Sequence, residues 1–269
     1  MSVITISRGS FSGGKLLAEC LSQRLGYRCI DRDVIIERAA AGGVSQNELM
    51  DTLLKPPGLL DRFRHRKYIY LTLIQAALAE EIRTGKVIYH GNAGHLLLRG
   101  APQMLRVRII APLEFRLNMV QERLKLNRSE ALAYIHSVDE NRIRWTRYLY
   151  GVSWGDPALY DIVLNLEQID VKEACEVVVT MATQKAFEFT TESLIAYEDV
   201  ALASRVRANL AMNIATSDLE VEVTAHSGSV SIKGTLATLD QIEEVKRVAR
   251  GTAGVTDLNL DELAPMPSV

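Results

Sequence analysis

The chain has 269 residues, of which 48% are hydrophobic and 24% are charged. This balance is ordinary for a globular protein and excludes the disordered, collagen-like and disulfide-scaffold classes. Lys and Arg total 31 and Asp and Glu total 33, so the formal net charge of -2 gives no overall basic excess of the kind that binds nucleic acid through phosphates. The three cysteines form no Cys-x-x-Cys pair. With no leader-like start and no apolar run of roughly 18 residues, we expect a cytoplasmic protein without a membrane span.

Short β-branched runs alternate with helical patterns along most of the chain. Strands are predicted at residues 3–7, 27–30, 87–89, 105–110 and 160–165. Helices are predicted at residues 16–25, 33–41, 62–83 and 113–150, and from about 171 onward. Strands that alternate with helices predict a parallel sheet covered by helices on both faces.

The pattern changes after about residue 198. A helix is predicted at 200–213, alternating strands at 219–223 and 230–232, a second helix at 241–250 and a final edge at 255–260, with Gly228 as a turn. These elements predict a small α+β unit close to the lower size limit for independent folding.

The strongest local signal is the segment from Gly9 to Leu16, which reads Gly-Ser-Phe-Ser-Gly-Gly-Lys-Leu. It fits the phosphate-loop pattern G-x-x-x-x-G-K but lacks the Ser or Thr that normally follows, and a leucine cannot replace a hydroxyl that binds Mg²⁺. Glycines allow successive backbone N–H groups to turn toward one anion, and the helix that follows adds its positive end. A Gly-rich turn with a surface lysine is the alternative interpretation. The residues expected to hold ATP phosphates are Gly9, Ser12, Gly13, Gly14, Lys15 and Leu16.

Several stretches resemble the cytidylate kinase-like family, relatives of the nucleoside monophosphate kinases. They are Ile6-Ser7-Arg8, Ser12-Gly13-Gly14 and Asp31-Arg32-Asp33 near the start, and residues 105–116 and 145–165 further along. The tail from about residue 198 to 262 resembles a BON domain, with Gly228, Gly234 and Gly254-Val255 at its typical glycine positions. The resemblance implies a three-layer α/β P-loop kinase-like domain with a parallel sheet and a helical lid over residues 1–185. A helical linker over 186–198 and a small C-terminal α+β BON-like domain over 199–269 would follow.

The resemblance further implies ATP-dependent phosphoryl transfer to a nucleoside monophosphate, with CMP as the leading acceptor and Mg²⁺ as the companion of ATP. Lys15, Arg142 and Arg147 would be catalytic, and Asp31, Arg32, Asp33 and Asn92 would bind the acceptor. The lid would contribute Arg142, Arg144, Arg147, Asp156 and Asp161. Two alternatives stay open: the aspartates cap the next helix, and the arginines form a solvated face. The four histidines His65, His95, His136 and His226 lack metal-ligand spacing, so we expect no protein metal site.

Three positions depart from the family pattern, and they motivate a second hypothesis. Asn92 stands where relatives often carry Arg, His90 where an acidic residue is common, and Leu16 where a hydroxyl belongs. These changes would affect turnover more than nucleotide binding. The alternative is therefore a catalytically weak or inactive nucleotide-binding regulatory protein whose BON-like tail binds a partner protein or a membrane surface. No nucleic-acid polymer is expected as a partner, and a homodimer is left open.

Overall fold

The computed structural model describes residues 2–54, 64–91, 93–236 and 238–265, which divide into two compact units. Within these residues, unit 1 contains 2–54, 85–99 and 103–189, and unit 2 contains 64–84, 100–102 and 190–265. Each unit has its own sheet and its own hydrophobic core, so each is described by itself.

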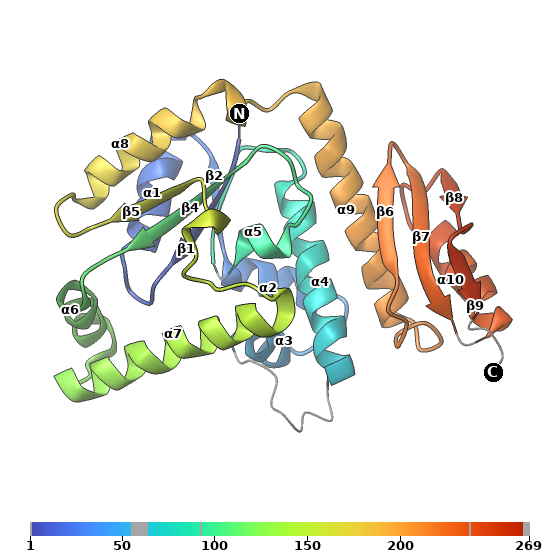
Figure 1. Ribbon diagram of the computed structural model, residues 1–269, viewed down its shortest axis with the longest axis horizontal. Helices are drawn as coiled ribbons and strands as arrows, with labels where there is room; N and C mark the ends of the chain where they lie inside the picture. Colours follow the sequence, from blue (N-terminus) through green and yellow to red (C-terminus); the bar gives the residue numbers. More distant parts are fainter. Residues whose placement is uncertain (1, 55–63, 92, 237, 266–269) are drawn as a thin grey trace. The chain divides into compact units, whose positions relative to one another are not determined.

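Unit 1 alternates strands and helices (Figure 1). Its strands are β1 (Val3–Arg8), β2 (Arg28–Asp31), β3 (Val87–His90), β4 (Met104–Ile110) and β5 (Ile162–Asn165). Its helices are α1 (Gly14–Leu25), α2 (Arg32–Ala40), α3 (Gln46–Leu54), α5 (Gly94–Leu97), α6 (Leu113–Leu124), α7 (Arg128–Tyr150) and α8 (Val171–Ala182). Two 3₁₀ turns, η1 (Pro157–Leu159) and η2 (Lys185–Phe187), complete it.

The five strands form one parallel sheet in the order β2-β3-β1-β4-β5, which confirms the predicted architecture. β1 lies at the centre, with Ile6 in register with His90 of β3 and with Val107 of β4. Because all strands point the same way, their carboxyl ends meet at one edge, where ligands bind in open α/β sheets. The Gly-rich loop begins at that edge, directly after β1.

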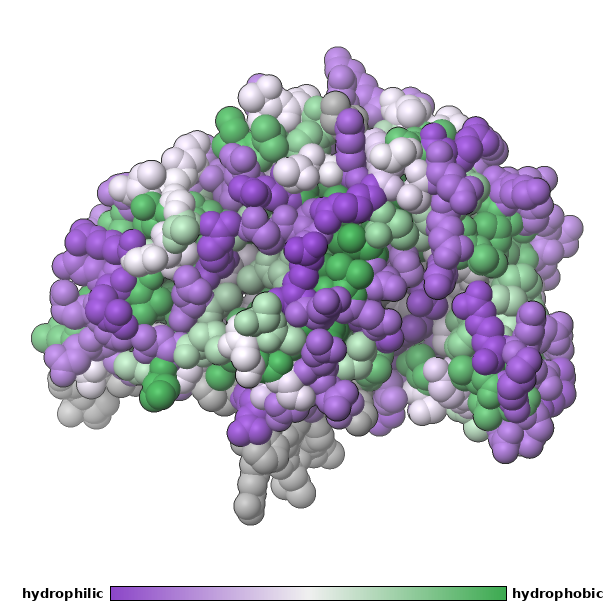
Figure 2. All heavy atoms as spheres, turned by 180° about the vertical axis from the view of Figure 1, so that it is seen from behind, coloured by the Kyte–Doolittle hydropathy of each residue, from purple (hydrophilic) through white to green (hydrophobic). Residues whose placement is uncertain are grey.

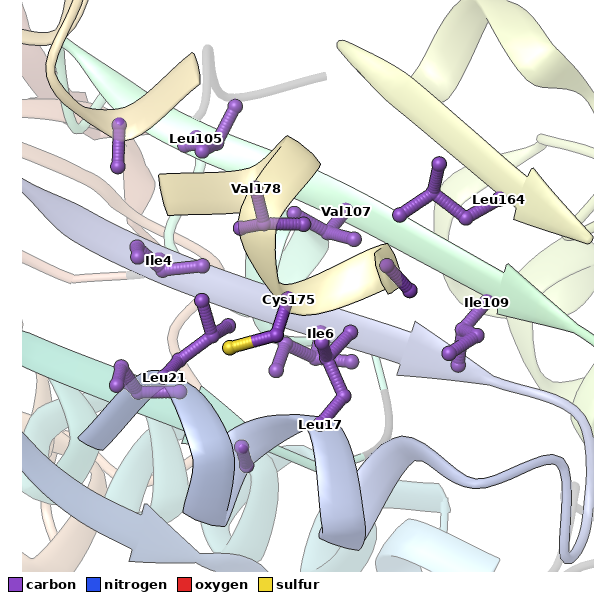
Figure 3. Close-up of a cluster of buried hydrophobic side chains, with 14 of the residues drawn as sticks. Ile4, Ile6, Leu17, Leu21, Leu105, Val107, Ile109, Leu164, Cys175 and Val178 are labelled. Atoms are coloured by element: carbon purple, nitrogen blue, oxygen red, sulfur yellow. The ribbon is translucent and has the colours of Figure 1, made fainter. Parts of the chain in front are cut away.

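Helices cover both faces of this sheet. Alternate residues of β1 point to opposite faces. Ile4 and Ile6 face a core with Leu17 and Leu21 of α1 and with Val178 of α8 (Figure 3). On the opposite face, a Cβ added to Gly94 of α5 would lie 3.3 Å from Thr5 Cγ2. The buried face of α1 fixes this helix against the sheet, and it thereby fixes the position of the loop that precedes it.

The predicted helix over 113–150 is two helices. Lys125 ends α6 in the left-handed conformation, with φ of 56°. Asn127 then starts α7 with a capping box, in which its side chain accepts from the Glu130 N–H and the Glu130 carboxylate accepts from the Asn127 N–H. The Asn-x-x-Glu spacing is the sequence signal for this break. α6 and α7 therefore form a helical hairpin between β4 and β5, where the resemblance places the lid.

Unit 2 is an α+β unit. It contains α4 (Arg64–Ile82), α9 (Thr191–Met212), β6 (Glu222–His226), β7 (Ser229–Leu236), α10 (Leu239–Arg250), β8 (Asp257–Asn259) and β9 (Leu263–Pro265). Its elements from α9 onward match the prediction, whereas α4 was expected in the α/β unit. β6 and β7 form an antiparallel hairpin, and β7 also pairs in parallel with β8 and β9. The hairpin turns at Gly228, whose φ of +88° favours glycine. Residues of α9, the strands and α10 form its core, and α4 packs along α9.

The surface in view is mainly polar. Hydrophilic residues cover most of the face in Figure 2, and hydrophobic residues form small separate areas between them. Among the described helices, none is both long enough and apolar enough to cross a bilayer.

Candidate functional site

The segment between β1 and α1 has the geometry of an anion-binding loop. Gly13 precedes α1 in the left-handed conformation, with φ of 84°, and no side chain caps the helix. The first backbone N–H groups of α1 are therefore not taken up by a capping side chain, as anion binding at a helix N-terminus requires. A Cβ at Gly14 would overlap the Arg8 side chain, so the close approach of these two residues needs glycine.

A pocket of about 480 Å³ opens beside this loop, within the range of about 300–1,000 Å³ that is common for small-molecule sites. The loop, α2, α3 and the α6–α7 hairpin contribute its walls. Its cationic side chains are Arg8, Lys15, Arg32, Arg123 and Arg142. Among the described residues that line it, none is Asp or Glu. Five cations without an acidic partner in the wall favour a ligand with several negative charges.

The cations act on one another inside this pocket. Burial, followed by the positive charge of Arg8, lowers the pKa of Arg142 to about 10, and Arg32 and Arg116 make smaller contributions in the same direction. The pKa of Arg8 is also lowered, first by burial and then by Arg32 and Arg123. The Nε atoms of Arg8 and Arg142 are buried without a hydrogen-bond partner. An anion bound in the pocket would reduce the repulsion between these cations.

Metal binding by side chains does not fit the pocket. Leu16 lines it at the position where a phosphate-loop hydroxyl would lie. His90 ends β3, and its pKa is lowered by burial and then by Arg8, so the imidazole is neutral near pH 7. The described residues contain no group of three His, Cys, Asp or Glu side chains that could hold an ion. A metal ion that entered with a polyphosphate ligand would take its ligands from the phosphate oxygens and from water.

The residues predicted to bind ATP phosphates divide into two groups. Gly13, Gly14, Lys15 and Leu16 line the pocket. The Lys15 ammonium lies 3.8 Å from Glu19 Oε1, one helical turn along α1. Ser12 instead directs its hydroxyl inward, where it donates to the carbonyl oxygens of Gly9 at 3.0 Å and Ile109 at 3.1 Å. The Ser12 side chain therefore stabilises the loop.

Of the residues predicted to bind the acceptor, Arg32 lines the pocket. Asp31 caps α2, because its Oδ1 accepts from the backbone N–H groups of Asp33 at 3.0 Å and Val34 at 3.1 Å. Asp33 accepts from Arg32 Nε at 3.2 Å and does not line the pocket. Asn92 lies outside the described residues. The geometry thus matches the capping alternative for Asp31, and the acceptor role of Arg32 stays a prediction.

Among the predicted lid residues, Arg142 reaches the pocket and its side chain is only 12% exposed. Arg144 and Arg147 are exposed on α7 and do not line the pocket. Asp156 caps η1 by accepting from the Ala158 N–H at 2.9 Å. Asp161 forms an ion pair with Arg106 at 2.6 Å. The structure therefore brings one of these five side chains to the phosphate loop.

Arg8 and Arg123 also line this pocket, although neither was predicted as a site residue. Arg8 immediately precedes the first glycine of the loop, which is a usable signal. Arg123 lies in the last turn of α6, and only the docking of the hairpin brings it near the loop. Asp139, three residues before Arg142, also contacts the loop through Ser10.

The tryptophan of the Trp-Gly-Asp-Pro turn packs at the end of β1. The Trp154 indole N–H donates to Ser7 Oγ at 3.0 Å, and the Arg108 guanidinium lies 4.3 Å from its ring centroid. Arg108 also donates to the Trp154 carbonyl at 2.7 Å. This arrangement holds the segment that follows α7 against the strand ends beside the loop.

Comparisons with known proteins bear on the family and the fold of the chain. The model of the cytidylate kinase-like family matches residues 3–168, and the BON domain model matches residues 198–261. A cytidylate kinase of Methanothrix thermoacetophila is 27% identical over 170 residues, which cover 62% of this chain and 90% of that protein. The crystal structure of an uncharacterized protein from Eubacterium ventriosum aligns with a TM-score of 0.55 at 17% identity. The alignment covers 69% of this chain and 100% of that one, and it supports the fold alone.

Proposed function

Because this chain belongs to the cytidylate kinase-like family, we propose that unit 1 transfers the terminal phosphoryl group of ATP to a nucleoside monophosphate, with CMP as the leading acceptor. The observation that carries the proposal is the pocket, where five cations and an uncapped helix N-terminus meet without an acidic residue among the described wall residues. Phosphoryl transfer needs little covalent chemistry from the protein and depends on positioning and charge neutralisation.

The side chains of the pocket have distinct roles in this proposal. The loop N–H groups and Lys15 hold the β- and γ-phosphates of ATP. Arg142 neutralises charge on the transferring group, and Arg32 binds the acceptor phosphate from the start of α2. ATP enters with Mg²⁺ as its counter-ion. Arg147 keeps its predicted catalytic role only if α7 rotates or shifts, since its side chain is exposed on that helix.

We propose residues 1–185 as the kinase-like domain, 186–198 as a linker and 199–269 as the BON-like domain. The cytoplasmic location, a homodimer and the contact of the tail with a protein or a membrane surface stay predictions.

The first experiment measures ADP formation from ATP and Mg²⁺ with CMP, dCMP, UMP, AMP and GMP in separate reactions. Turnover with one acceptor assigns the substrate. Lys15→Met is then expected to lower kcat by about a hundredfold or more, because a charge contact to the transition state is lost. The exposed Lys185→Met is the matched control. Wild-type turnover by Lys15→Met would refute the assignment of the phosphate loop.

A second candidate, a nucleotide-binding regulator without efficient turnover, is favoured by Leu16 in the pocket and by the neutral His90 at the end of β3. It predicts ATP binding by isothermal titration calorimetry, no ADP formation with any of the five acceptors, and an association of the tail that changes with nucleotide. Turnover of any one acceptor would exclude a purely regulatory role.

A further inference from the structure

The α6–α7 hairpin contacts Ser10 of the phosphate loop at its backbone N–H and at its carbonyl oxygen. Asp139 Oδ1 of α7 accepts from the Ser10 backbone N–H at 3.1 Å and from the Ser10 hydroxyl at 2.9 Å. Arg116 of α6 donates from Nε to the Ser10 carbonyl oxygen at 2.7 Å and from Nη2 to Ser10 Oγ at 2.6 Å. Arg116 and Asp139 also form an ion pair with each other. The three residues thus form one closed network that joins two helices to the loop.

The network is largely withdrawn from water. The Arg116 side chain is 15% exposed, the Asp139 side chain is 21% exposed, and Ser10 is buried. Charge-assisted hydrogen bonds are strongest where water is excluded, unlike those of an exposed ion pair. Removing the Asp139 carboxylate leaves the Arg116 charge buried without this partner, so the network responds sharply to that substitution.

The loop conformation itself requires an external support. Phe11, which follows Ser10, has a φ of +58°. This left-handed conformation suits glycine and is unfavourable for a bulky side chain. Such conformations persist only where the surroundings enforce them. Here the support comes from α7, because the Phe11 ring packs edge-to-face on Tyr134 with centroids 6.0 Å apart. Ser10, the residue before Phe11, is the one that Asp139 holds at its N–H and Arg116 at its carbonyl oxygen.

The same network reaches the pocket cations. Arg142 Nη1 lies 3.7 Å from Asp139 Oδ1 and donates to the Arg8 carbonyl oxygen at 2.8 Å. Asp139 therefore contacts two arginines, of which Arg142 lines the pocket and Arg116 holds the loop. The backbone of the loop and the guanidinium of Arg142 are positioned from one carboxylate.

We propose that Asp139 and Arg116 are positioning residues that give the phosphate loop its ligand-binding shape only while the α6–α7 hairpin is docked on it. We name these two residues with Ser10 the loop latch. This inference rests on the proposed function in one respect, namely that nucleotide phosphates are the ligand of the loop. Docking of the hairpin is then coupled to the conformation of the loop. The loop does not adopt its phosphate-binding conformation while the hairpin is undocked.

The test compares Asp139→Asn with Glu140→Gln. Asp139→Asn keeps the size of the side chain and removes its charge. Glu140→Gln removes a charge from the adjacent position of α7, where the side chain is 69% exposed and touches Arg144 at 4.0 Å. Hydrogen exchange of a peptide that spans residues 7–14, in the protein without nucleotide, reports on the loop directly. Steady-state kinetics and ATP titrations of the same proteins report on its use.

For Asp139→Asn we expect loop exchange to be about tenfold faster or more and kcat to fall about tenfold or more, with a smaller change in the KM for ATP. The smaller change in KM follows because the lost negative charge also makes the pocket more positive. Glu140→Gln is expected to match wild type in each measurement. A residue that only stabilises the fold would lower the melting temperature and leave the kcat of the folded protein unchanged.

A second pair of variants tests whether the latch acts as a unit. Arg116→Gln is expected to reproduce the loss in Asp139→Asn, and the double variant is expected to lose no more than the worse single one. The proposal would be overturned if the losses of the two single variants multiplied in the double variant, or if the loop of Asp139→Asn exchanged at the wild-type rate. If wild type transfers no phosphoryl group to any acceptor, the proposed function fails, while loop exchange and ATP affinity still decide on the latch.

Discussion

Replacing Arg142 with methionine is expected to stabilise the nucleotide-free protein while it weakens the binding of phosphate groups. Methionine has a similar length, has no charge and adapts to irregular spaces. Arg142 is held in a pocket with other cations, and its side chain is nearly buried. The change therefore removes a charge from a place where that charge is costly in the absence of an anion.

The size of the effect follows from two opposing contributions. Burial and the charge of Arg8 lower the pKa of Arg142 to about 10, and about 1.4 kcal/mol corresponds to each pKa unit. The protonated side chain is thus less stable in the folded protein than in water by roughly 3 kcal/mol. The variant also loses the hydrogen bond to the Arg8 carbonyl, which is worth about 1–2 kcal/mol. The net expectation is a gain of about 1–2 kcal/mol, or roughly 2–8 °C in melting temperature for a unit of this size.

The assay is calorimetric unfolding of the full chain with and without ATP. Arg144→Met is the matched control, since Arg144 lies on the same helix, is 63% exposed and donates to Asn141. We expect Arg142→Met to melt above wild type without ATP and to gain less from added ATP, because fewer charges contact the phosphates. Added salt should narrow the difference between the nucleotide-free proteins by screening the cations. A nucleotide-free Arg142→Met protein that melts at or below wild type would refute the argument that the pocket cations repel one another.

Two further predictions concern stability. Burial, with Arg106 and Arg108, lowers the pKa of His95 to about 4, so below about pH 6.5 the unfolded chain binds a proton that the folded protein does not. The free energy of unfolding should therefore fall by about 3 kcal/mol as the pH drops from about 6.5 to 4. His95→Phe should remove this loss, which urea unfolding at pH 7 and pH 4.5 would measure. Parallel pH profiles for wild type and His95→Phe would contradict the prediction. The Trp145 indole N–H donates to the Thr52 carbonyl at 2.8 Å, so Trp145→Phe should cost about 1–3 kcal/mol in the same urea assay, and an unchanged midpoint would count against this bond.

Local patterns predicted the sheet and the loop well, because their signals lie in neighbouring residues. Val3 to Ile6 read as a buried strand, and the glycines that follow supply the left-handed φ at Gly13. The cap at Asp31 was also foreseeable, since an aspartate before a helix accepts from its first N–H groups. The Asn-x-x-Glu spacing at Asn127 is a local signal of the same kind for the capping box that starts α7.

The membership of the pocket could be predicted only in part, because it depends on how α6 and α7 dock. At 3.6 residues per turn, Arg144 and Arg147 lie about 200° and 140° around α7 from Arg142, so they point away from the loop when Arg142 points toward it. Asp139 lies only about 60° from Arg142 on the same turn-to-turn row. The angular positions on the helix therefore explain why Asp139 contacts the loop and Arg144 and Arg147 do not. Arg123 could not be found this way, since a long-range contact brings it there.

The placement of α4 affects how the protein can be divided. This helix lies between β2 and β3 along the chain and within the segment that matches the cytidylate kinase-like family, yet it packs along α9 in unit 2. A fragment that stops after Phe189 would keep α4 and lose the helix that covers it, so its exposed apolar side would promote aggregation. The two family domains are thus not structurally independent. A C-terminal domain transferred from a relative must have an α9 surface that is complementary to α4. Substitutions on the facing sides of α4 and α9 are expected to be compatible only in pairs.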